Sequence, residues 1–106
     1  MQLNDMTLFR QQALIDGLCR DAPNGDVIAV TNPANGEQLG SVPRMGADDT
    51  REAIEAADRA LPAWRARTAK ERANILRRWF DLMVEAQDDV ARLMTLEQGE
   101  PLAEAK

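Results

Sequence analysis

The chain has 106 residues, of which 44% are hydrophobic and 29% are charged, and its formal net charge at pH 7 is −5. This length suits one small domain with a modest hydrophobic core. The acidic balance argues against binding to nucleic acids or to anionic membranes, because both need clustered Lys and Arg side chains.

Histidine is absent, and Cys19 is the single cysteine. Ser-His-Asp and Cys-His nucleophilic pairs are therefore excluded, as are the common zinc sites built from Cys and His. Cys19 has Arg20 beside it but no base, so we interpret it as a structural residue.

The cellular compartment is predicted from the same features. Residues 1–6 carry neither a basic flank nor an apolar run, and no segment approaches the length of a transmembrane helix. A lone cysteine cannot form an internal disulfide and fits a reducing environment. We expect a cytoplasmic protein.

Turn signals dominate residues 1–46. Residues 7–10 predict a single helical turn, and Asp16-Gly17 between short apolar runs indicates a type I′ hairpin. Further turns and strands follow at regular spacing: turns over 23–25 and 32–36, strands over 26–30 and 37–42. This spacing predicts a small antiparallel meander.

A first helix is expected from about Ala47. Its apolar positions follow helical spacing: Ala53, Ile54, Ala57, Leu61 and Trp64. Glu55 and Arg59 are spaced for an ion pair one turn apart. Because Pro62 disfavours helical geometry at the preceding residue, we expect this helix to end near Ala60.

The second helix has the clearest start, because Thr68 and Glu71 form a capping box. Its apolar stripe is wide and predicts contact with more than one neighbour: Ile75, Leu76, Trp79, Phe80, Met83 and Ala86.

A third helix is predicted from Asp88, with Asp88 and Arg92 spaced for an ion pair. Its expected buried side consists of Val90, Leu93, Met94 and Leu96. Gly99 is suited to a left-handed cap, and Pro101 to the first position of a fourth helix that has made barely one turn by Lys106.

The sequence thus predicts an α+β piece with a strand and turn segment over 1–46 and a helical segment over 47–106. Since the last helix is too short to be stable alone, we expect this piece to be the front of a longer protein. The alternative is a stand-alone, non-catalytic helical interaction module with its own closed core.

Other candidate sites have simpler interpretations. The acid pairs Asp48-Asp49 and Asp88-Asp89 suit helix starts, and the basic stretch over 64–67 with Arg77-Arg78 suits a solvated face paired with acids. The glycines give neither a dinucleotide-binding nor a phosphate-binding loop. We therefore predict no catalytic, cofactor-binding or metal-ligating residue in this chain.

Six segments, which together extend over nearly the whole chain, carry a resemblance to a known family: 9–17, 30–36, 39–48, 60–65, 70–77 and 94–99. Their Asn-Pro-x-x-Gly turn, Pro-x-Trp step and Leu-Glu-x-Gly-x-Pro corner resemble the start of the aldehyde dehydrogenase superfamily. Within it, the chain is most similar to the bacterial NAD(P)-dependent succinate-semialdehyde dehydrogenases.

This resemblance implies an α/β parent of roughly 450 to 500 residues, a size that divides into several domains. The parent would be a homo-oligomer with a Rossmann-like cofactor domain that binds NAD or NADP, a catalytic domain and an oligomerisation arm. The present residues would be the N-terminal part of the cofactor-binding domain, whose remainder they contact. The family's hydride passes from a thiohemiacetal on a cysteine to the nicotinamide, and a glutamate activates the hydrolytic water.

None of the family's catalytic or cofactor-binding residues has a counterpart here, and Cys19 does not match its nucleophile. The piece alone is therefore expected to be inactive and to bind no cofactor. One minor site of some members, a monovalent cation held by backbone carbonyls and an acid, would correspond to Val30, Thr31 and Glu97.

Overall fold

The computed structural model describes residues 1–106. In chain order its elements are η1 (Met6–Leu8), β1 (Ala13–Ile15), β2 (Leu18–Arg20), β3 (Val27–Thr31), β4 (Gln38–Pro43), α1 (Ala47–Ala66), α2 (Ala69–Glu85), α3 (Gln87–Gln98) and α4 (Leu102–Ala105). The α+β class and the order of strands before helices are confirmed.

The strands form two separate antiparallel hairpins, β1–β2 and β3–β4, instead of one continuous meander. The tip of the first hairpin confirms the type I′ turn, because Asp16 and Gly17 both have positive φ angles, 54° and 73°. Between the hairpins, the Gly25 amide donates to the Ala22 carbonyl at 2.9 Å. After this turn β3 pairs with β4 and not with β2, so it starts a new sheet.

Helix α1 extends to Ala66, so the predicted end near Ala60 is wrong. Pro62 lies inside the helix, where it removes one backbone hydrogen bond. Good helix formers follow Pro62, and the helix continues despite the loss of this one backbone hydrogen bond.

The N-terminal cap of α2 and the C-terminal cap of α3 are those that the sequence predicts. The Glu71 amide donates to the Thr68 hydroxyl at 3.2 Å, and the Thr68 amide donates to the Glu71 carboxylate at 3.1 Å. Gly99 ends α3 with a φ of 77°, and its amide donates to the Thr95 carbonyl at 2.9 Å. Pro101 is the N-cap residue of α4, one position before the predicted one.

The two predicted ion pairs within helices are wrong, because their members have partners elsewhere. Arg59 of α1 lies 4.0 Å from Asp16 of the β1–β2 turn instead of pairing with Glu55. Asp88 pairs with Lys106 at 2.7 Å, while the Arg92 guanidinium donates to the Gln2 carbonyl at 2.5 Å.

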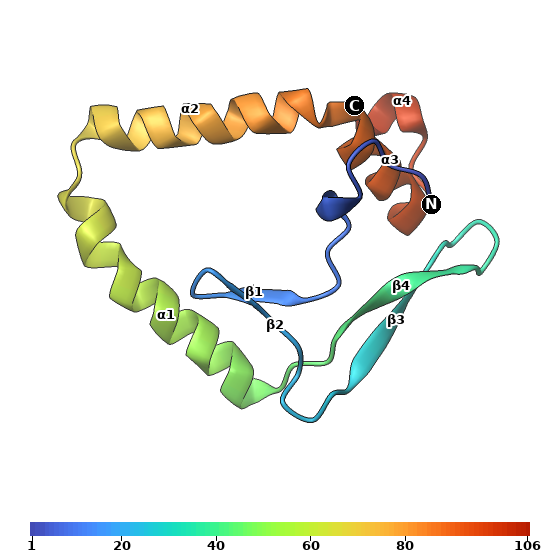
Figure 1. Ribbon diagram of the computed structural model, residues 1–106, viewed down its shortest axis with the longest axis horizontal. Coiled ribbons are helices and arrows are strands. Elements are labelled where there is room, and N and C mark those ends of the chain that lie inside the picture. The colour runs from blue at the N-terminus through green and yellow to red at the C-terminus, as the bar shows by residue number, and fades with distance from the viewer.

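The molecule is flat and open, with principal extents of 48 × 36 × 20 Å. The long helices α1 and α2 meet at a corner, and α3, the N-terminal segment and the β1–β2 hairpin complete a circuit (Figure 1). The radius of gyration is 16.7 Å, whereas a compact domain of this length has roughly 13 Å. We call this circuit the frame.

The buried hydrophobic residues are few and small, namely Ile15, Ala22, Ala56 and Ala91. Ile54, one of the apolar positions at helical spacing in α1, is 64% exposed, whereas Ala56 of the same helix is buried. In α3 the fully buried residue is Ala91, not the larger side chains of the predicted stripe, and Val90 is exposed. Most apolar side chains of the helices therefore lack a covering partner.

Candidate functional site

The main candidate site is the apolar surface of helix α2, which has no buried residue along its 17 positions. Its exposed large side chains are Ile75, Leu76, Trp79, Phe80, Leu82, Met83 and Val84. Trp79 is 62% exposed, although burying such a side chain would be strongly favourable. An apolar surface of this extent in a folded domain marks an interaction site.

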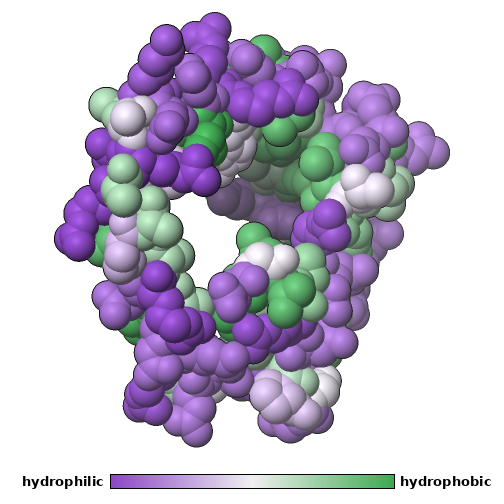
Figure 2. All heavy atoms as spheres, turned by 60° about the vertical axis from the view of Figure 1, so that its left-hand side comes forward, coloured by the Kyte–Doolittle hydropathy of each residue, from purple (hydrophilic) through white to green (hydrophobic).

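An opening runs through the frame, and hydrophobic side chains occupy parts of its rim (Figure 2). Phe80, Met83 and Val84 also line a groove that α2 shares with α3 and α4. Apolar surface thus faces more than one direction from α2, which agrees with the wide stripe in its sequence.

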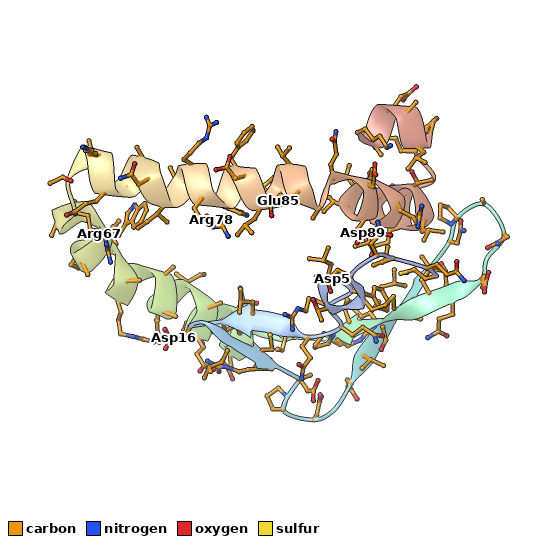
Figure 3. The ribbon with its side chains drawn as sticks, turned by 45° about the horizontal axis from the view of Figure 1, so that its top comes forward. Asp5, Asp16, Arg67, Arg78, Glu85 and Asp89 are labelled. Atoms are coloured by element: carbon orange, nitrogen blue, oxygen red, sulfur yellow. The ribbon has the colours of Figure 1, made fainter.

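The first twelve residues, which we call the strap, form the polar closure of the frame. The Asp89 side chain of α3 accepts the backbone amides of Asn4 and Asp5, both at 2.8 Å. Figure 3 shows Asp5 and Asp89 adjacent at this junction. The Thr7 hydroxyl and the Thr7 amide both donate to the Asp5 carboxyl. These bonds, with the hydroxyl having the larger effect, lower the pKa of that carboxyl below its usual value.

The acid pairs at the helix starts have different roles. Asp48 pairs with Arg51 at 2.8 Å, and Asp49 accepts the Gly46 amide at 2.9 Å, as expected of residues at a helix start. Asp89 is 4% exposed and holds residues more than 80 positions away in the sequence. Sequence reasoning missed this role, because local spacing shows a helix start and nothing of the distant strap.

The basic stretch pairs with acids only in part. Arg77 lies 3.3 Å from Asp81 and 5.1 Å above the Phe80 ring. Arg65, Arg67 and Arg78 make no ion pair, and Arg67 lies at the α1–α2 corner (Figure 3). The predicted pairing therefore holds only for Arg77.

Cys19 is free and exposed on β2, and no three Cys, Asp or Glu side chains lie together as a group that could hold a metal ion. None of the helices combines the length and the apolar character that crossing a bilayer demands. The exposed apolar surface of α2 is suited to contact with other apolar surface.

The implied cation position lies where two distant segments meet. A β-bulge interrupts the β3–β4 register between Val30 and Thr31. A Cβ atom added at Gly99 would lie 3.1 Å from the Pro33 side chain, so the turn after Thr31 contacts the end of α3 that carries Glu97. Glu97 is exposed, and the cation site stays a prediction.

Comparison with known proteins identifies relatives of the whole chain. It is 76% identical over all 106 residues to the succinate-semialdehyde dehydrogenase [NADP(+)] of Escherichia coli, of which it covers 22%. It is 74% identical, over the same share, to the glutarate-semialdehyde dehydrogenase of Pseudomonas aeruginosa. The crystal structure of an E. coli NADP-dependent enzyme matches 98% of the chain with a TM-score of 0.96 and 75% identity, and the chain covers 22% of it.

The chain thus spans about a fifth of the length of these relatives. The model of the aldehyde dehydrogenase family matches residues 20–106. The turn, step and corner that carry the resemblance in sequence lie within the matched region, and the backbone agrees closely with the solved structure. The chain therefore belongs to the aldehyde dehydrogenase family.

Proposed function

We propose that this chain is the N-terminal part of an NAD(P)-dependent dehydrogenase that oxidises a semialdehyde, with succinate semialdehyde as the first candidate substrate. The names of the E. coli and P. aeruginosa relatives support a semialdehyde whose far end carries a carboxylate. The name of the E. coli relative supports NADP⁺, and NAD⁺ is the alternative. Residues 1–46 and 47–106 together form part of the cofactor-binding domain.

One observation carries the proposal that further chain covers this piece. Its accessible surface is 8064 Å², whereas a folded monomer of this mass exposes about 5,900 Å². The excess is larger than the roughly 800 Å² that one partner contributes to a standard interface. We infer that the rest of the cofactor-binding and catalytic domains lies against α2 and the rim of the frame.

The chemistry of the parent lies outside this piece. We propose that the 106 residues bind no cofactor and supply no catalytic group, since they hold no histidine and only one exposed cysteine that lacks a base. The parent is proposed to be a cytoplasmic homo-oligomer that binds neither nucleic acid nor membranes.

A chimera tests the proposal. In the E. coli relative, the aligned segment is replaced by this chain, and reduction of NADP⁺ or of NAD⁺ is followed with succinate semialdehyde and glutarate semialdehyde. We expect the chimera to turn over at least one semialdehyde and the isolated chain to give no rate above buffer. Turnover by the isolated chain, or a soluble chimera inactive with both cofactors and both substrates, would contradict the proposal.

The stand-alone interaction module is not favoured. Such a module needs a closed core of its own, and the buried hydrophobic residues here are one isoleucine and three alanines. Their combined burial is small for a chain of this length.

A further inference from the structure

The strap is fastened at its first end by a buried carboxylate. The side chain of Asp89 accepts two consecutive backbone amides, and its exposed fraction is 4%. No Lys or Arg pairs with it. Its two oxygens are therefore hydrogen-bonded by the strap amides, and it lies in the first turn of α3, as the third residue.

A second contact reinforces this end. The Arg92 guanidinium, one turn further along α3, donates to the Gln2 carbonyl at 2.5 Å. The strap backbone thus donates two amide hydrogen bonds to the Asp89 carboxylate and accepts one hydrogen bond, at a carbonyl, from the Arg92 guanidinium. This pattern fixes the direction of the strap along α3.

The other end of the strap is fastened to strand β4. The Ser41 amide donates to the Gln11 side-chain oxygen at 3.0 Å. A Cβ atom at Gly40 would lie 2.6 Å from that oxygen and 2.7 Å from the Phe9 ring, so the strap approaches β4 where only glycine leaves room. Gln11 occupies an edge amide that a further strand would otherwise use.

We propose that the strap is a conformational tie that fixes the orientation of helix α3 against the β3–β4 hairpin, with Asp89 as its positioning residue. The contact of Pro33 with Gly99 joins the same two elements at one corner. A single corner permits rotation, and the strap, attached to α3 through Asp89 and to β4 through Ser41, prevents that rotation. The two attachments then act as one cooperative unit.

Amide exchange in the full 106-residue chain tests this coupling. In Asp89→Asn we expect the Asn4 and Asp5 amides, and also the distant Ser41 amide, to exchange about tenfold faster, because a charge-assisted bond is lost. The matched control Asp88→Asn removes a neighbouring carboxylate that pairs with Lys106 and should leave all three amides unchanged. Faster exchange at Asn4 and Asp5 with an unchanged Ser41 amide would overturn the tie.

A distance measurement tests the orientation directly. Spin labels are placed at the exposed positions Ala29→Cys on β3 and Glu97→Cys on α3, in a Cys19→Ser background. We expect Asp89→Asn to broaden the distance distribution and Asp88→Asn to leave it narrow. Should Asp89→Asn fail to fold by circular dichroism, Gln11→Ala releases the other end and must accelerate exchange at Asn4 and Asp5. Unchanged exchange in that variant overturns the proposal.

Discussion

Gly99 meets two constraints at one position. Its φ of 77° is a conformation that disfavours side chains, and the Pro33 side chain lies only 3.1 Å from the position that a Cβ atom would take. Gly25 has the same φ of 77° with nothing within 4 Å of an added Cβ, which makes it a matched comparison.

We predict that Gly99→Ala lowers the free energy of unfolding by about 2 kcal/mol and Gly25→Ala by about 1 kcal/mol, the cost of left-handed geometry alone. Urea unfolding followed by circular dichroism measures both. Equal losses would show that the Pro33 contact adds nothing.

The Asp88–Lys106 pair predicts an acid transition at the end of the chain. Hydrogen bonding from Lys106, followed by the attraction of its charge, lowers the Asp88 pKa below 3.8. When folding lowers the pKa of a carboxyl, that carboxyl stabilises the folded state at any pH above the pKa it has in the unfolded chain. The stabilisation is lost as the pH falls through the lower pKa of the folded state.

We therefore expect the contact between Lys106 and α3 to be intact above pH 4 and to be lost at lower pH. NMR titration of the Asp88 carboxyl and of the Lys106 amide measures this, with Asp88→Asn as the control that shows no transition at Lys106. An Asp88 pKa at or above 3.8 would contradict the pairing.

At the scale of elements, sequence reasoning succeeded where neighbouring residues decide the structure. The Asp16-Gly17 turn, the Thr68 capping box and the Gly99 cap depend on atoms within a few residues of each other. The partners of Arg59 and Asp89 lie far away in sequence, so local spacing could not reveal them. The burial of Ala56 and Ala91, in place of larger neighbours, likewise depends on where other elements lie.

Helix α1 offers a prediction of increased stability. A proline inside a helix lowers the free energy of unfolding by about 3 kcal/mol. Its rigid ring also restricts the unfolded chain, which raises the free energy of unfolding by up to about 1 kcal/mol. Pro62→Ala should therefore raise the free energy of unfolding by about 2 kcal/mol.

The comparison variant is Pro101→Ala, which lies before α4 and has no interior helix bond to restore. Thermal melting of both variants, followed at 222 nm, provides the check. A lower melting temperature for Pro62→Ala would mean that the proline fits this helix without cost.

At the scale of the whole molecule, the open frame leads to a prediction about the large apolar residues of α2. We expect them to contribute to stability and activity only when other protein covers this helix. Trp79 is 62% exposed, so Trp79→Asp should change the stability of the isolated chain by no more than about 0.5 kcal/mol. In the chimera the same substitution places a charge against apolar surface and should abolish activity.

Lys70→Asp, on the same helix, is the control and should leave the chimera active. If Trp79→Asp were equally active in the chimera, α2 would not be the covered face.

We propose that helix α2 is uncovered in this chain and would be covered in a longer enzyme that contains it. Hydrogen exchange of the amides over 75–86, measured in the isolated chain and in the chimera, tests this directly. We predict fast exchange in the isolated chain and at least a hundredfold slowing in the chimera. Equally slow exchange in both, reflecting a closed core within the 106 residues, would contradict it.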